Sequence, residues 1–116
     1  LGSWKLDAIT GQVRWSDQVY RIHGVDPQSF DPSLDDAVRY YHPDDRQAVH
    51  DWITKAIETG EPGEFRLRLI RTDGQERIVV SQCRPERREG RTVALYGVFQ
   101  DVTERVQAED ILAASE

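Results

Sequence analysis

A change in hydrophobic periodicity at Gly60 constrains the fold of this chain more than any other feature. Before Gly60, apolar residues recur at the spacing of an α-helix that buries one side: Val49, Trp52, Ile53, Ala56 and Ile57. After Gly60, apolar residues alternate with charged ones from Glu64 to Leu69, which is the period of a strand with one buried face. The chain is therefore expected to contain a long helix followed by strands.

Three consecutive antiparallel strands are predicted after this helix. Asp73-Gly74 is a strong hairpin signal, and Glu89-Gly90 predicts a second turn. These turns separate a strand over 64–69, a strand over 77–84 and a strand over about 92–102. Strands that follow one another through tight turns form a meander.

The N-terminal residues predict two more strands and a short helix. Residues 4–8 and 13–15 alternate apolar and charged side chains on either side of a Thr10-Gly11 turn. Ser16 is expected to cap the helix that follows, and Gly24 to end it in a left-handed conformation. The five strands can together form one antiparallel sheet.

The middle of the chain predicts a loop and two helix starts. Residues 25–32, which include two prolines, Pro27 and Pro32, are expected to form the loop. Ser33 then caps a short helix with Asp36, and Pro43 begins the long helix, with an acidic pair, Asp44-Asp45, favoured there by the helix dipole. The predicted fold class is α+β, with short helices on one face of a five-stranded antiparallel sheet.

The end of the last strand leads directly into a polar helix. Asp101 and Thr103 stand at this junction, where side chains can hydrogen-bond the free amides of a helix start, and Thr103 is expected to be the N-cap. Glu104 and Arg105 can pair with charges on the domain surface. We predict that these four residues couple the sheet to the helix. The alternative is that Thr103 is only a cap and Asp101 an ordinary strand end.

Composition excludes several classes of partner. The 116 residues carry 15 basic and 21 acidic side chains, and acidic residues are interleaved with the arginines of the predicted sheet, so we expect no nucleic-acid partner. No apolar run approaches the roughly 20 residues of a membrane span, so we expect no direct membrane contact. The single cysteine, Cys83, fits a reducing, cytoplasmic location. Because the chain begins with Leu1, we expect it to be a piece of a longer polypeptide.

Several short motifs occur in a specific order along nearly the whole chain. They are Gly2–Asp7, Thr10-Gly11, Val13–Asp17, Tyr20–Gly24, His42–Arg46, Phe65–Leu67, Asp73-Gly74 and Gly97–Arg105. Together they resemble a PAS sensor domain of the bacterial signalling type. The resemblance implies a sheet and helices that enclose a small pocket, without catalysis, within a histidine kinase or a diguanylate cyclase. It also implies a sensory domain over 1–102 and the start of a signalling helix over 103–116.

Candidate pocket residues are the apolar residues expected on the helices and on the inward face of the sheet. They are Tyr20, Ile22, Phe30, Tyr41, Ile53, Leu67, Leu69, Val80, Tyr96 and Val98. For each of them, the alternative is that the side chain fills the core of a small domain and contacts no ligand.

The histidines and the cysteine predict no resident cofactor. His42 and His50 are not at the spacing that places two metal ligands on one helix face, and His23 and His50 are expected to be partly exposed. In haem-binding members of the resembled family an axial histidine lies on the long helix, which makes His50 the residue to test. Cys83 lacks the Asn-Cys-Arg-Phe context of flavin-binding relatives. Haem or flavin remains the alternative.

The predicted partners are an output domain of the same polypeptide, a second copy of the chain and a small-molecule ligand. Ala108, Ile111 and Leu112 lie along one side of the last helix, which cannot bury that side alone, and we therefore expect a homodimer. Two alternatives stay open. One is a structural dimerisation spacer that binds nothing, and the other is a haem or flavin sensor of light or redox state.

Overall fold

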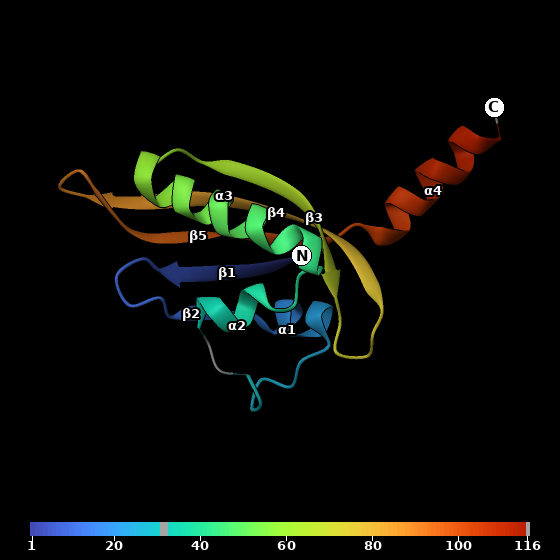
Figure 1. Ribbon diagram of the computed structural model, residues 1–116, viewed down its shortest axis with the longest axis horizontal. Helices are drawn as coiled ribbons and strands as arrows, with labels where there is room; N and C mark the ends of the chain where they lie inside the picture. Colours follow the sequence, from blue (N-terminus) through green and yellow to red (C-terminus); the bar gives the residue numbers. More distant parts are fainter. Residues whose placement is uncertain (31–32, 116) are drawn as a thin grey trace.

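The computed structural model describes residues 1–30 and 33–115 and has a five-stranded antiparallel sheet at its centre (Figure 1). Its strands are β1 (Gly2–Asp7), β2 (Val13–Trp15), β3 (Gly63–Ile70), β4 (Glu76–Arg88) and β5 (Arg91–Asp101). Their order is β2-β1-β5-β4-β3, so the N-terminal pair joins the meander where β1 pairs with β5. The predicted sheet is confirmed. Pro32, which was expected in a loop, lies outside the described residues.

Helices cover one face of this sheet (Figure 1). They are α1 (Asp17–His23), α2 (Leu34–Val38), the 3₁₀ turn η1 (Pro43–Asp45) and α3 (Arg46–Thr59), while α4 (Thr103–Ala114) projects away from the sheet. Pro43 thus begins a 3₁₀ turn that leads into α3, and α3 itself begins at Arg46. The predicted α+β architecture is correct.

The predicted helix caps have different outcomes. Ser33 caps α2, because its hydroxyl accepts a hydrogen bond from the Asp36 amide at 3.3 Å. Ser16 occupies the N-cap position of α1, as expected, but its hydroxyl forms no hydrogen bond with the helix. Its hydroxyl instead accepts from the Ser3 amide at 2.9 Å, which ties the start of α1 to β1. Gly24 ends α1 with a φ of 69°, in the left-handed conformation that was expected.

Asp45 does more than complement a helix dipole. Its carboxylate accepts two hydrogen bonds from the Arg68 side chain, at 3.0 and 2.7 Å, and one from the Arg68 amide at 2.9 Å. The side-chain hydrogen bond of Arg68 is the main cause that lowers the pKa of Asp45. This paired contact fastens the start of α3 to β3.

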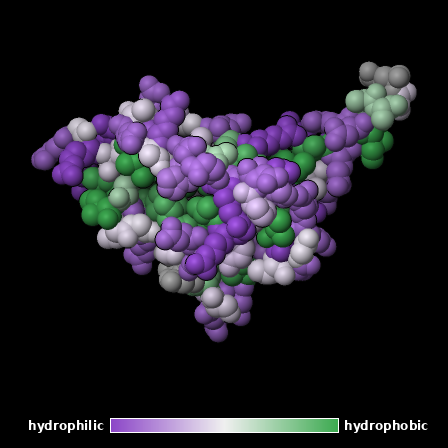
Figure 2. Space-filling view, in the orientation of Figure 1, coloured by the Kyte–Doolittle hydropathy of each residue, from purple (hydrophilic) through white to green (hydrophobic). Residues whose placement is uncertain are grey.

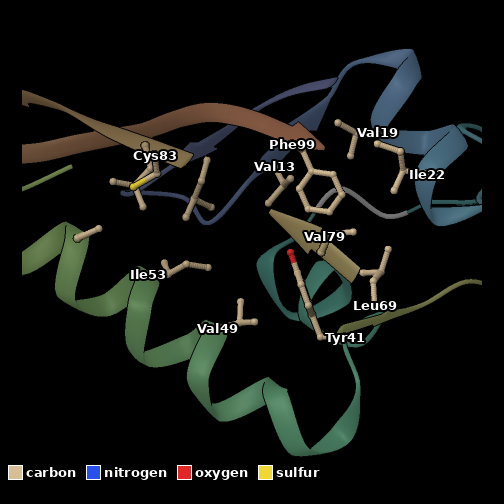
Figure 3. Packing of buried hydrophobic residues seen from close by; sticks show 13 residues of the cluster. Val13, Val19, Ile22, Tyr41, Val49, Ile53, Leu69, Val79, Cys83 and Phe99 are labelled. Carbon is tan, nitrogen blue, oxygen red and sulfur yellow. The ribbon is translucent and has the colours of Figure 1, made fainter. Parts of the chain in front are cut away.

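The hydrophobic core lies between the sheet and α1–α3 (Figure 3). α3 contributes Val49, Ile53 and Ala56, and the sheet contributes fully buried residues such as Leu69 and Leu95. The residues of α4 face solvent after its first turn, and Figure 2 shows hydrophobic side chains on this projecting helix. In the part of the chain that the structure describes, no helix is long and apolar enough to cross a membrane.

Candidate functional site

A group of hydrogen bonds fixes the point where β5 becomes α4. The Asp101 carboxylate accepts from the Thr103 amide at 2.9 Å and from the Thr103 hydroxyl at 2.6 Å. Val102 occupies the N-cap position, and Thr103 is the first helical residue. The prediction that Thr103 is the N-cap was wrong by one residue. The amide that needs a partner belongs to Thr103, and Asp101 supplies the acceptor.

The same junction is tied to β4. The Thr103 hydroxyl oxygen accepts from the Ile78 amide at 2.8 Å, and the Val102 amide donates to the Ile78 carbonyl at 2.8 Å. Arg77 donates to the other carboxylate oxygen of Asp101 at 2.7 Å. Burial raises the pKa of Asp101, but the hydrogen bonds from Arg77 and Thr103 outweigh it and lower the pKa. The junction therefore connects β4, β5 and α4 through an ionised carboxylate.

Glu104 and Arg105 are exposed and lie farther from these bonds. Both line an open groove, with Arg77 and Asp101, between α1 and the start of α4. Arg105 lies 3.4 Å from Glu109 of the same helix, so its ion pair is within α4 and not with the domain surface. Among the described residues no hydrogen bond or ion pair involves the Glu104 side chain. Glu104 and Arg105 were predicted to pair with charges on the domain surface, and within the described residues neither does so.

A cavity of about 60 Å³ lies between the sheet and the helices. It is lined by side chains from the sheet and from α1 to α3: Trp4, Leu6, Val13, Trp15, Val19, His23, Leu34, Ala37, Val38, Tyr41, Val49, Trp52, Ile53, Phe65, Ser81 and Phe99. Of the predicted pocket residues, Tyr41 and Ile53 line this cavity. Figure 3 shows both of them directed into the same interior as Phe99.

Five other predicted pocket residues belong to the core around this cavity. Ile22, Phe30 and Leu69 are buried, and Leu67 packs against the buried cluster. Tyr20 is half-buried and places its ring edge against Trp15, with a centroid distance of 5.3 Å. None of the five lines the cavity.

Val80, Tyr96 and Val98 were expected on the inward face of the sheet, and the structure places them on the outer face. Side chains alternate between the two faces of a strand, and Val79 and Phe99 occupy the buried positions next to them. Tyr96 and Val98 are 45% and 36% exposed and line a shallow groove on the outer face of the sheet. Val80 on β4 and both Tyr96 and Val98 on β5 were therefore assigned to the wrong face of the sheet.

The sequence analysis missed His23, which it expected to be partly exposed. His23 is 2% exposed and lines the cavity. Its ring stacks on Trp15 at a centroid distance of 4.0 Å and on Phe99 at 5.2 Å, and Nδ1 lies 2.7 Å from the Val19 carbonyl oxygen. Burial lowers the pKa of His23 to about 4. His23 follows Val19 by four positions and so lies on the same buried side of α1, and this helical spacing was the signal that could have identified it.

The other candidates for metal or cofactor chemistry lie outside the cavity. His50 is exposed on α3, and the His42 ring accepts from the Asp44 amide at 3.1 Å, at the helix start where it was expected. Cys83 is 2% exposed on β4, and burial raises the pKa of its thiol, which disfavours the reactive thiolate. Within residues 1–30 and 33–115, no group of three or more histidine, cysteine or carboxylate side chains could hold a metal ion.

The chain is similar to sensor proteins among curated sequences. It is 31% identical over 112 residues to the Blue-light-activated histidine kinase of Brucella ovis, an alignment that covers 94% of this chain and 22% of that protein. It is 29% identical over 120 residues to the Sensor protein FixL of Bradyrhizobium diazoefficiens, covering 100% of this chain and 23% of that protein. The chain thus spans less than a quarter of the length of these relatives.

Solved structures and a family model give the fold. The N-terminal domain of a diguanylate cyclase with PAS/PAC sensor from Marinobacter aquaeolei superposes with a TM-score of 0.82 at 23% identity, covering 90% of this chain and 97% of that one. A sensory box histidine kinase/response regulator from Burkholderia thailandensis gives 0.79 at 24% identity, covering 98% and 86%. The model of the PAS fold matches residues 12–99. This chain therefore belongs to the PAS-fold family.

Proposed function

We propose that this PAS domain is the sensory module of a larger signalling protein and acts on an output domain through α4. In this proposal the domain performs no catalysis. A change in its interior or at an interface alters how α4 leaves the sheet, and the output domain, a histidine kinase or a diguanylate cyclase, responds. The kinase and cyclase names of the similar proteins support this choice of parent.

The observation that carries the proposal is the bonding of Asp101 and Thr103. These two residues hold the first turn of α4 to β4 through Arg77 and the Ile78 amide. Val102 at the N-cap position is buried as well, but few other apolar contacts accompany these bonds, because Thr103 is the only buried residue of the described helix α4. A helix held by a small set of polar contacts can change orientation when a second arrangement of those contacts has a similar free energy.

The test is the substitution Asp101→Ala in the full-length parent protein. We expect signal-dependent output to be lost, because the Thr103 amide and Arg77 lose their shared acceptor. Asp35→Ala is the matched control, since Asp35 is an exposed aspartate on α2 that is far from the junction along the chain. If Asp101→Ala leaves the output dependent on the signal while thermal melting shows a folded domain, the coupling role is wrong.

The proposed partners follow from exposed groups and from charge. Ile111 and Leu112 of α4 are 72% and 65% exposed, which supports pairing with a second copy in the parent protein. Analytical ultracentrifugation of the parent with Leu112→Asp, compared with Glu109→Gln, tests this homodimer. A nucleic-acid partner and a direct membrane contact are not part of the proposal, and we place the domain in the cytoplasm.

The small cavity favours a second candidate function, a dimerisation spacer that senses nothing. Its volume of about 60 Å³ is well below the roughly 300 Å³ at which drug-sized ligand pockets begin. Mass spectrometry under native and denaturing conditions distinguishes the two functions. A retained small molecule supports the sensor, and a domain that binds nothing and whose removal leaves only dimerisation impaired supports the spacer.

We do not propose a haem or flavin sensor, because the interior does not fit either group. The cavity is far smaller than these molecules, and neither His50 nor Cys83 lines it. An ultraviolet-visible spectrum of the freshly purified protein tests this point. A Soret band that is lost in His50→Ala, or a flavin spectrum, would contradict it.

A further inference from the structure

Three basic residues lie in one row on the outer face of the sheet, the face that the helices leave open. Arg14 of β2 pairs directly with Lys5 of β1, and Lys5 pairs with Tyr96 of β5. Tyr96 in turn pairs with Arg84 of β4. All four residues are exposed and line the groove on this face, and we call them the basic row. Neighbouring strands are about 4.8 Å apart, so the row spans about 14 Å.

The positive charges of the basic row are not neutralised by the described residues. None of the ion pairs in this part of the chain involves Lys5, Arg14 or Arg84. No carboxylate is among the residues that line the groove. Arg14 and Lys5 are direct cross-strand partners, and like charges in that position destabilise a sheet. A bound anion would remove this repulsion.

Acidic residues on both sides of the basic row limit the size of such an anion. Asp7 lies two positions after Lys5 on the same face of β1, and its carboxylate accepts hydrogen bonds from two backbone amides of the turn that follows. On the other side, Glu64 of β3 accepts from Gln82 at 3.0 Å. The whole chain has a net charge of −6. An extended polyanion would therefore run from the row into negative charge, whereas a small molecule would not.

The donors of the basic row suit phosphate or carboxylate oxygens. The guanidinium groups of Arg14 and Arg84 can each donate two parallel hydrogen bonds to such a group, and the Lys5 ammonium group supplies further donors. Tyr96, which lies between Lys5 and Arg84 in the sheet, adds a hydroxyl. Long, flexible basic side chains on three adjacent strands can meet around one molecule that carries several charges. A singly charged anion would leave most of these donors unused.

We propose that the basic row binds a small polyanion, a molecule with several negative charges on phosphate or carboxylate groups. Arg14, Lys5 and Arg84 each donate to one of its charged groups, and the Tyr96 hydroxyl donates to the group above it. None of these four residues lines the interior cavity, and the hydrogen bonds of the β5–α4 junction involve other side chains. The site goes beyond the proposed function, because it gives the domain an anion site on the face opposite its helices.

Four anions at matched ionic strength test the class of ligand. Pyrophosphate and citrate carry several charges, whereas phosphate carries fewer and acetate only one. We expect at least one of the first two to shift the NMR amide signal of Gly97, which lines the groove, in a saturable way and to leave Gly74 in the β3–β4 turn unchanged. Phosphate should bind at least about fivefold more weakly, and acetate should give no saturable shift.

The same titrations identify the chemical source of the charge. Binding of pyrophosphate alone supports a phosphate compound as the ligand, and binding of citrate alone supports a carboxylate compound. Binding of both supports a site that reads the number of charges. In each case the affinity should fall as sodium chloride is added, because salt screens contacts between exposed charges.

Substitutions in the basic row test the assigned contacts. Arg14→Gln and Arg84→Gln each remove one charge and should weaken polyanion binding about fivefold. The combined substitution Lys5→Gln, Arg14→Gln and Arg84→Gln should abolish it. Arg66→Gln is the matched control, since Arg66 is an exposed arginine of β3 that does not line the groove. Thermal melting checks that each variant is folded, which we expect because the substituted side chains are exposed.

Several results would overturn the inference. They are no saturable shift of Gly97 with either polyanion, equal affinity for acetate, and an equal loss of affinity in Arg66→Gln and Arg84→Gln. A single-stranded oligonucleotide that binds more tightly than both polyanions would also overturn it and assign the row to nucleic acid. The proposed function fails separately, through the output of Asp101→Ala in the parent protein.

Discussion

Two helices of this domain, α3 and α4, begin at the same kind of ion pair but differ in how much of their length is buried. α3 starts where Asp45 pairs with Arg68 of β3, and α4 starts where Asp101 pairs with Arg77 of β4; both ion pairs have N–O distances of 2.7 Å. α3 then lies on the sheet and buries apolar side chains along its length, whereas α4 leaves the sheet. We therefore expect α3 to depend little on its polar contact and α4 to depend strongly on its own.

Under the proposed function, this difference lets the body of the domain stay rigid while α4 transmits a change. The position of α3 is maintained by hydrophobic burial, which is large and does not depend on one bond. The start of α4 is held by buried Val102 and by hydrogen bonds around Asp101 and Thr103, which contribute about 1–3 kcal/mol each. A modest change in the domain can compete with contacts of that size.

The largest expected effect comes from removing a core side chain of α3. Ile53→Ala should lower the free energy of unfolding by about 2–5 kcal/mol, because it leaves a space in a packed interior. The same kind of truncation on α4, Ile111→Ala, should change it by less than about 0.5 kcal/mol, because Ile111 is 72% exposed. Urea denaturation of both variants measures the difference. Similar losses would show that α4 is packed and would remove the contrast.

As the pH falls, protonation of His23 in the unfolded chain should lower the stability of the domain before either ion pair breaks. The pKa of His23 is about 4 in the folded domain, whereas an exposed histidine, as in the unfolded chain, has a pKa of 6.5. Between these two pH values only the unfolded chain binds a proton at His23. Stability should therefore fall by about 3 kcal/mol as the pH drops through this window, and it should be fully present above pH 6.5.

The two ion pairs persist over that window, because the pKa values of both Asp45 and Asp101 are lowered below the usual aspartate value. Denaturant unfolding at a series of pH values measures the loss, and His23→Phe should abolish it. An unchanged pH dependence in the folded His23→Phe variant would assign the effect to another group.

Breaking the two ion pairs one at a time tests the comparison directly. Asp101→Ala should cost about 2 kcal/mol and raise hydrogen exchange at the Val102 and Thr103 amides about tenfold or more. Asp45→Ala should leave the amides of α3 protected, because buried Val49 and Ile53 still hold that helix. Hydrogen exchange read by NMR distinguishes the outcomes. Equal deprotection of both helices would mean that α3 also depends on its polar contact.

The smallest effect is expected from the Thr103 hydroxyl. Thr103→Val keeps the shape of the side chain but removes the acceptor of the Ile78 amide, which should cost about 1 kcal/mol of stability. Thr103→Ser retains the hydroxyl and should keep most of the stability that Thr103→Val loses. Thermal unfolding of the two variants checks this. A loss in Thr103→Ser with none in Thr103→Val would assign the role of Thr103 to its methyl group.

Much of the architecture could be predicted because it depends on local patterns. The change of period at Gly60, the Asp73-Gly74 turn and the Ser33 cap are properties of neighbouring residues, and the structure confirms them. The cavity was only partly predictable. Tyr41 and Ile53 were identified as buried and inward, but Val80, Tyr96 and Val98 were assigned to the inward face and lie on the outer face.

The sequence by itself determined the strands, the helices, their order and the resemblance to PAS domains, because periodicity and turn chemistry act over a few residues. Only the tertiary structure decided which polar groups become partners. Arg77 and Asp101 are 24 positions apart in the chain. His23, near the N-terminus, stacks on Phe99, near the C-terminus. Burial of His23 and the bonding of Asp101 depend on contacts between distant segments, which a local pattern does not encode.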